Sequence, residues 1–227
     1  MLVKIRLVFS LAGWHKIWPD LSMLAKIVKI GLPISAQNLT FTLIYWFLIQ
    51  IVHHFGDTAG AAMGIGNRME AMSYLVAFGF SIAASTLVGQ NLGARQPERA
   101  EKCVWAVVKL IVAETSIVSI IFITIPGLIT NAFTSDAAVH KIASDYLFIL
   151  GLSQVFMGVE IVLEGAFSGA GNTIPPMAVS IPWSIARLPL AYLFSFTLNM
   201  GINGVWGALT ITSLCKAIIL FFWFRRG

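Results

Sequence analysis

The stretch GLPISAQNLTFTLIYWFLIQIV, residues 31–52, decides what kind of fold this chain adopts, because it contains no charged side chain. As a helix it is about 33 Å long, enough to cross the roughly 30 Å hydrocarbon core of a bilayer. Its apolar residues run continuously instead of alternating with polar ones, which argues against a strand of a membrane barrel. The stretch therefore predicts a transmembrane helix.

Five further apolar runs of comparable length follow along the chain, at residues 59–87, 104–125, 142–167, 175–198 and 205–224. Short segments rich in Gly, Pro, Asn or Asp separate them, as connections between helices require. We therefore predict an all-α integral membrane protein in which residues 31–227 form six transmembrane helices.

The overall composition supports this prediction. Of the 227 residues, 58% are hydrophobic and 11% are charged, and the mean hydropathy is +0.85. A soluble domain is about one quarter charged, and this chain has too little polar surface to cover an apolar interior of that size. Intrinsic disorder is excluded for the same reason. The two cysteines, Cys103 and Cys215, form neither a metal motif nor a disulfide framework.

The distribution of basic residues predicts the orientation in the membrane. Ten Lys and Arg residues lie in the N-terminal segment, in the connection after the second span and at the C-terminus, whereas the opposite side has only Lys141. Basic residues collect on the cytoplasmic side, so both termini are expected there, which agrees with an even number of spans. The net charge of +5 is thus explained without nucleic-acid binding. We expect a multi-pass protein of the cell membrane.

Residues 1–30 are expected to form a cytoplasmic segment ahead of the first span. Within it, Leu21, Leu24, Ala25 and Val28 have helical spacing, and Lys26 and Lys29 lie away from that face. This pattern predicts an interfacial amphipathic helix over residues 21–29. A plain juxtamembrane linker is the alternative.

Two acidic residues in the fourth span, Glu160 and Glu164, are the most informative charges inside the membrane. They are four positions apart, so they share one helical face. Two neighbouring carboxylates in a low dielectric do not both ionise cheaply, so the pair is a candidate for proton exchange or for binding a small cation. The structural alternative is an ion pair in which Arg187, on the next span, neutralises one of them.

The second span carries Arg68 and Glu70, which are two positions apart and so do not face each other on a helix. Each needs another partner, so Arg68 is a possible ion-pair partner, and Glu70 is expected to line a cavity and meet a cationic ligand. Gln37 and Asn38 make the first span unusually polar, as is typical of a cavity-lining helix. Pro182 and Pro189 are expected to free backbone carbonyls and bend the fifth span.

Small residues recur at four-residue spacing and predict close helix packing: Gly56, Gly60 and Gly64; Gly89 and Gly93; Gly165 and Gly169. No HExxH, GxSxG or P-loop motif occurs, so the sequence indicates neither an enzyme nor a metal or organic cofactor.

Three segments carry a family resemblance. Residues 88–94 (VGQNLGA), followed by Pro97-Glu98-Arg99-Ala100, closely resemble a signature of the multidrug and toxic compound extrusion family. Gly31-Leu32-Pro33 resembles that family's entry to its second half. Gly169-Ala170-Gly171-Asn172-Thr173 with Pro175-Pro176 resembles the loop between the family's tenth and eleventh helices. The matches occur in the family's order and cover nearly the whole chain.

The resemblance implies one lobe, the C-terminal one, of a twelve-helix transporter with two six-helix lobes. It implies export of small molecules, often organic cations, in exchange for protons or sodium ions, with an N-terminal lobe or a second six-helix copy completing the cavity. Arg68 and Glu70 resemble the branch related to the DNA-damage-inducible transporter. The sequence departs from other members at Phe41, which stands about where some carry a glutamate in their seventh helix.

Two other functions compete with export. A flippase for lipid-linked precursors, from a related superfamily, would need a basic cavity, to which Arg68, Arg187 and Lys216 contribute. Four acids within the spans weigh against it. A truncated, non-transporting membrane remnant would tolerate neutralisation of every acid within the spans.

Overall fold

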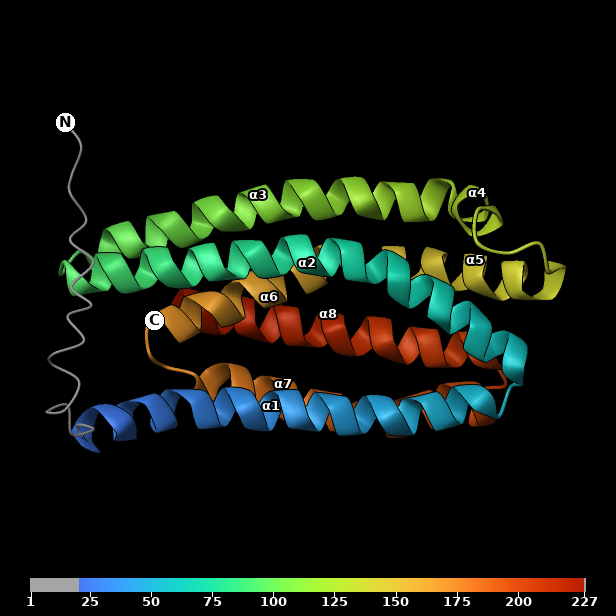
Figure 1. The fold of residues 1–227 in the computed structure, drawn as a ribbon, viewed down its shortest axis with the longest axis horizontal. Coiled ribbons are helices and arrows are strands. Elements are labelled where there is room, and N and C mark those ends of the chain that lie inside the picture. The colour runs from blue at the N-terminus through green and yellow to red at the C-terminus, as the bar shows by residue number, and fades with distance from the viewer. Residues whose placement is uncertain (1–20, 227) are drawn as a thin grey trace, which may run out of the picture.

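The computed structural model describes residues 21–226, and these form helices and no strand (Figure 1). The expectations for residues 1–20, including Lys4, Arg6 and Lys16, lie outside the described residues. In chain order the elements are α1 (Leu21–His53), α2 (Asp57–Gly93), α3 (Pro97–Thr124), α4 (Pro126–Asn131), α5 (Ala137–Gly151), α6 (Gln154–Gly169), α7 (Ile174–Tyr192), the π-helical segment η2 (Leu193–Thr197) and α8 (Ile202–Arg226).

The helices confirm the predicted all-α membrane architecture. Five are long and apolar enough to cross a bilayer, and α5 with α6 makes a sixth span if this bent pair is counted as one. The first turns of α1, residues 21–29, are exposed and continue without a break into the span. Their position at a membrane surface stays a prediction.

The fourth span differs from the continuous helix that the sequence predicts. It is broken between α5 and α6, where the two helices meet at 55°, although no proline lies nearby. Hydroxyl groups donate to carbonyl groups at the break: Ser119 of α3 donates to Gly151 at 2.6 Å, and Ser153 donates to Leu150 at 3.0 Å. Such side-chain donors make a break tolerable inside a membrane bundle. In contrast, α7 continues as a helix through its two internal prolines.

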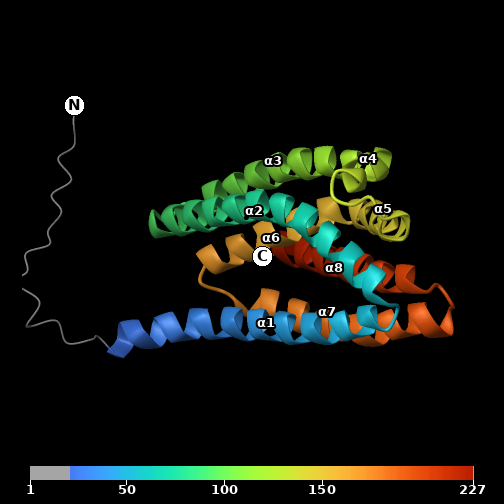
Figure 2. The same ribbon diagram turned by 45° about the vertical axis from the view of Figure 1, so that its right-hand side comes forward.

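The helices form two groups with α8 between them (Figures 1 and 2). On one side α1 packs along α7, and on the other α2 packs along α3 and α6, while α8 contacts both α7 and α6. The direct contact between α1 and α2 is slight. This arrangement leaves space in the middle of the bundle for a cavity.

Close packing at small residues holds α6 against α2. A methyl group on Gly165 would collide with the backbone of Ser81, and one on Gly169 would collide with the backbone of Ser85. The predicted close approach is therefore confirmed for this pair. It is wrong for Gly64, Gly93 and Gly56: a methyl group on either of the first two would meet no atom within 4 Å, and Gly56 serves a turn with a positive φ of 95°.

Two of the family-like segments form turns at the same end of the bundle. The first closes α2, where Ala94 and Gln96 donate backbone hydrogen bonds to Gln90 and Asn91. The second closes α6, where Gly171 adopts a positive φ of 73° and the Thr173 hydroxyl donates to the Ile30 carbonyl of α1. These turns join neighbouring helices where α1 begins and α8 ends (Figure 1).

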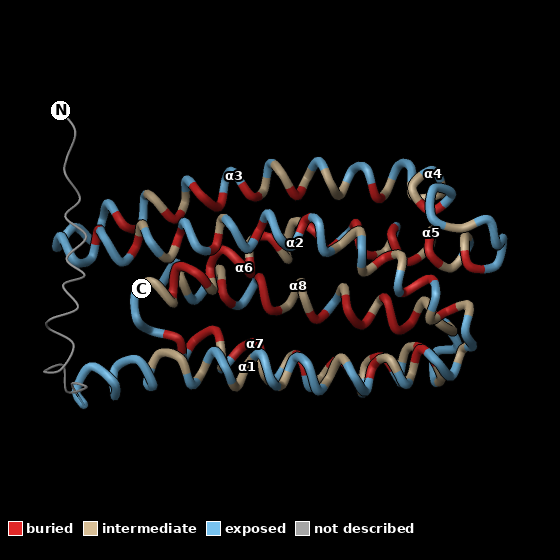
Figure 3. Tube along the Cα trace, viewed as in Figure 1, coloured by how far each residue is buried: buried red, intermediate tan, exposed pale blue. Residues whose placement is uncertain are grey.

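The outer surface of α1 is largely exposed (Figure 3). Only Leu48 and Val52 of this helix are buried, whereas several large apolar side chains face outward: Leu32, Leu39, Leu43, Trp46 and Phe47. An apolar exterior of this kind is what a bilayer or a neighbouring membrane helix covers.

Candidate functional site: a charged cavity inside the bundle

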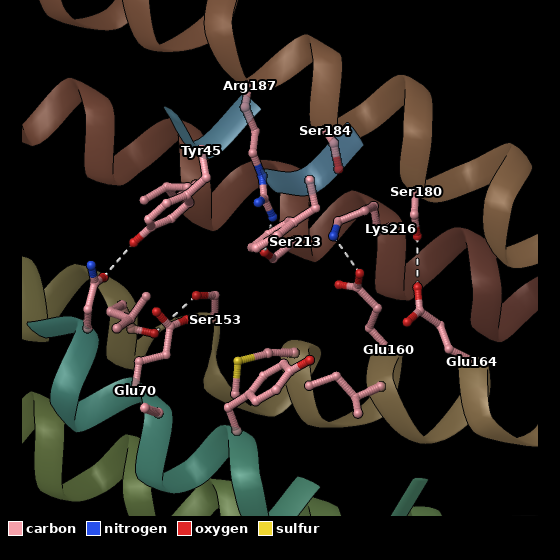
Figure 4. Close-up of a pocket in the computed structure, with 18 of the residues that line it drawn as sticks. Tyr45, Glu70, Ser153, Glu160, Glu164, Ser180, Ser184, Arg187, Ser213 and Lys216 are labelled. Atoms are coloured by element: carbon pink, nitrogen blue, oxygen red, sulfur yellow. Dashed lines mark hydrogen bonds and ion pairs between the residues drawn. The ribbon is translucent and has the colours of Figure 1, made fainter. Parts of the chain in front are cut away.

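A cavity of about 460 Å³ lies between the two groups of helices and is lined by α1, α2, α5, α6, α7 and α8 (Figure 4). Its wall contains three carboxylates, Glu70, Glu160 and Glu164, and two cations, Arg187 and Lys216. The structure thus brings all three acids of the predicted site into one cavity. Gln37 and Asn38 line it as well.

Glu160 forms an ion pair with Lys216, whose Nζ lies 2.5 Å from a Glu160 carboxylate oxygen. Both side chains are buried, with 8% and 7% of their surfaces exposed. A buried charge needs such compensation, since the surroundings supply little solvation. The sequence predicted Arg187 as the partner of one acid in this helix, which is wrong because α8, not α7, packs along this part of α6.

Glu164, one turn further along α6, forms no ion pair within residues 21–226. One carboxylate oxygen accepts hydrogen bonds from Gln37 Nε2 of α1 at 2.6 Å and from Ser180 Oγ of α7 at 2.8 Å. Both donors are neutral, so these hydrogen bonds bring no opposite charge to Glu164. Glu164 also links three helices that meet at this point of the wall.

Glu70 of α2 reaches into the opposite side of the cavity (Figure 4). Among residues 21–226 it has neither a hydrogen bond nor an ion pair. Its neighbour Asn67 accepts hydrogen bonds from the hydroxyl groups of Tyr45 at 2.7 Å and Tyr146 at 3.1 Å. The charges of Arg187 and Lys216 act on Glu70 across the cavity.

Arg187 of α7 is 6% exposed and is held by hydroxyl groups of α8. Its Nε donates to Thr212 Oγ1 at 2.9 Å and its Nη2 donates to Ser213 Oγ at 3.1 Å. Its guanidinium carbon lies 5.7 Å from the centre of the Phe41 ring, a distance typical of a cation–π contact. Phe41 thus lines the cavity, at about the position where the resemblance implies a glutamate in some family members.

Arg68 lies outside this site. Its side chain is exposed on α2 and is not part of the cavity wall. Within residues 21–226, Glu160 and Lys216 form the one ion pair. The expectation that Arg68 forms an ion pair is therefore wrong for this part of the chain. The reason is that Arg68 is exposed on the helix surface, away from the acids of the cavity wall.

Sequence reasoning missed several members of the cavity wall. Ser180, Ser213 and Asn67 carry no signal of their own, since single small polar residues are common in membrane helices. Lys216 did carry one, as a lysine within an otherwise apolar span. Its partner could not be read from spacing because the two residues lie on different helices. Within residues 21–226, no three His, Cys, Asp or Glu side chains are grouped as metal ligands.

A second hollow of about 320 Å³ adjoins the cavity on the side of the two family-like turns. The two share Gln37, Tyr74 and Glu164 among their wall residues. Hydroxyl groups line the second hollow further along: Ser81, Ser85, Thr86, Ser168 and Thr173. Glu164 therefore lies where the central cavity meets a polar hollow nearer to the end of the bundle.

Comparisons with known proteins give a consistent result. A family model described as MatE matches residues 33–193. A probable multidrug resistance protein NorM of Thermotoga maritima is 29% identical over 214 residues, which are 92% of this chain and 45% of that protein. An FAD transporter of Shewanella oneidensis is 26% identical over 203 residues, 89% of this chain and 44% of that protein.

Solved structures resemble the fold as well. The crystal structure of MATE in the bent conformation has a TM-score of 0.86 at 20% identity and covers 93% of this chain and 47% of that one. The chain thus spans about half the length of the relatives it matches.

Proposed function

Because this chain belongs to the MatE family, we propose that it forms the C-terminal lobe of a secondary transporter that exports organic, often cationic, compounds in exchange for protons or sodium ions. The observation that carries the proposal is the cavity wall, in which Glu70 and Glu164 form no ion pair with any of the described residues. An organic cation, a proton or a sodium ion would each supply the missing positive charge.

Competition for these carboxylates would couple the two fluxes. A proton or sodium ion that neutralises a carboxylate removes the charge that holds the organic cation, so the cargo leaves as the coupling ion arrives. Alternating access requires that the organic cation and the coupling ion stabilise different conformations, one open to each side of the membrane. Glu164 joins α1, α6 and α7 through its hydrogen bonds, so a change in its charge alters contacts between helices that would move.

The other half of the cavity must come from elsewhere in the assembly. Either an N-terminal lobe or a second six-helix copy would face the cavity. We further propose that both termini are cytoplasmic. The described basic residues near the ends of helices support this orientation, because Lys26, Lys29, Arg95, Arg99, Lys102, Arg225 and Arg226 gather at one end of the bundle.

The two relatives named above indicate different cargoes, multidrug compounds and FAD, so the substrate must be inferred from this chain's own cavity. Assignment to the branch related to the DNA-damage-inducible transporter stays a prediction.

The test is efflux of a fluorescent organic cation from cells that lack their own exporters. The native chain is expressed alone and together with an N-terminal lobe, and Glu70→Gln and Glu164→Gln are compared with it. Lys109→Gln serves as the control, since Lys109 is exposed on α3, which contributes nothing to the cavity. We expect both glutamine variants to reach the membrane and to lose efflux. Full efflux by both variants would show that these carboxylates do not couple transport.

A further inference from the structure

Arg187 is a buried cation that forms no ion pair within residues 21–226. It is 6% exposed and lines the cavity, yet its hydrogen bonds within residues 21–226 go to the hydroxyl groups of Thr212 and Ser213. A buried cation is costly unless an opposite charge is close. Lys216, the other cation of the cavity, has its carboxylate at 2.5 Å, and the contrast indicates that Arg187 has a different role.

The surroundings fix the direction of the guanidinium group. Thr212 donates its own hydroxyl hydrogen to the backbone of α8, to Ala208 at 2.8 Å and Leu209 at 3.0 Å, so its oxygen is free to accept from Arg187. The Phe41 ring lies 5.7 Å from the guanidinium carbon. A guanidinium has five N–H donors, and two of them are used here. Three remain for a ligand in the cavity.

Glu70 presents the complementary situation on the opposite wall. It is a carboxylate that lines the same cavity without a hydrogen bond or ion pair among the described residues, although the charges of Arg187 and Lys216 act on it from a distance. One wall of the cavity therefore has an anion, Glu70, and another has a cation, Arg187, that form no ion pair within residues 21–226 (Figure 4). Neither charge reaches the other directly, so each is available to a bound molecule.

We propose that Arg187 is an anion subsite, and that the cavity selects zwitterionic molecules whose carboxylate binds Arg187 and whose cationic group binds Glu70. The planar fork of a guanidinium matches the two oxygens of a carboxylate, and such charge-assisted bonds are stronger than neutral ones. This inference rests on the proposed function and narrows its substrate class. An organic cation without a carboxylate would offer Arg187 no ion-pair partner.

The experiment uses two dyes that differ in one group: a rhodamine with a free benzoate, which is zwitterionic, and the methyl ester of the same rhodamine, which is only cationic. Binding to the purified chain is measured by fluorescence polarisation, and export is measured in cells. The native chain should bind the zwitterion about tenfold more tightly than the ester, the factor expected for a hydrogen-bonded charge pair. Arg187→Gln should remove this preference with little effect on the ester.

Two further variants separate charge from structure. Arg187→Lys keeps the cation and should retain part of the preference, while Lys109→Gln should leave it unchanged. If Arg187→Gln does not fold, Ser213→Ala takes its place. This variant removes a hydroxyl that orients Arg187 and should reduce the preference about threefold.

The outcomes distinguish this inference from the proposed function. Equal binding of the two dyes by the native chain, or an equal loss of both in Arg187→Gln, overturns the anion subsite. If the ester is still exported in a manner that requires Glu70, the proposed transport function stands in spite of that result. If the native chain neither binds nor exports either dye, both proposals are overturned.

Discussion

Glu160 and Glu164 are separated by one turn of the same helix and face the same cavity, yet they have opposite electrostatic environments. Glu160 is neutralised by Lys216 at 2.5 Å, whereas Glu164 is held by the neutral donors Gln37 and Ser180. The difference arises because α8 passes beside the first residue, and α1 and α7 meet at the second. A shared helical face therefore sets where two carboxylates lie, and the neighbouring helices determine what each can do.

The largest expected effect comes from breaking the pair on the Glu160 side. Lys216→Gln alone leaves a buried carboxylate without compensation, so we expect a loss of about 3–5 kcal/mol in unfolding free energy. The double variant with Glu160→Gln should recover most of it, because no buried charge remains. Thermal unfolding of the purified protein in detergent measures both. A double variant no more stable than the single one would show that the ion pair is not the source of the loss.

A smaller loss of unfolding free energy is expected at Gly165, the residue after Glu164, where α6 packs closely against α2. Gly165→Ala places a methyl group against the backbone of Ser81, and overpacking of this kind costs about 1–3 kcal/mol. The matched control is Gly79→Ala, since a methyl group there would meet no atom within 4 Å. Equal melting temperatures for the two variants would contradict the close packing of α6 and α2.

On the Glu164 side, Gln37→Ala removes one of the two hydrogen bonds to the carboxylate. Because the site is only partly buried, we expect a loss of about 1–2 kcal/mol, at the lower end for bonds to charged groups. Asn38→Ala is the control, since the Asn38 side chain lines the cavity without a hydrogen bond within residues 21–226. Denaturant unfolding of both variants checks the difference. No difference between them would mean that water replaces Gln37 at no cost.

The smallest effect on stability is expected for Glu164→Gln. The amide oxygen of glutamine can still accept from Gln37 and Ser180, so the unfolding free energy should change by less than about 1 kcal/mol. Efflux should nevertheless be lost, because the ionisable group is gone. Unfolding and dye efflux measured on the same preparation test this separation. Strong destabilisation by Glu164→Gln would show that Glu164 is a structural residue like Glu160. It would contradict the proposed difference between the two carboxylates.

Much of the fold could be predicted from sequence, but little of the detailed site. The continuous apolar runs gave the spans, and the position of Glu160, Glu164 and Glu70 within them pointed to a cavity. The break between α5 and α6 was not predicted, because it depends on hydroxyls such as Ser119 on another helix. The prolines of α7 drew attention to a different span, where the helix continues through them. The break in the fourth span is thus set by packing, whereas the bend expected at the prolines of α7 stays a prediction.

The sequence by itself determined that the chain spans a membrane and which residues share a helical face. Both follow from the cost of placing charges in hydrocarbon and from the period of the helix, which do not depend on distant neighbours. Only the tertiary structure decided that Lys216 neutralises Glu160, that Gln37 reaches Glu164 and that Arg187 forms no ion pair within residues 21–226. Such pairings depend on which helices pack side by side and at what height, and that is a property of the whole bundle.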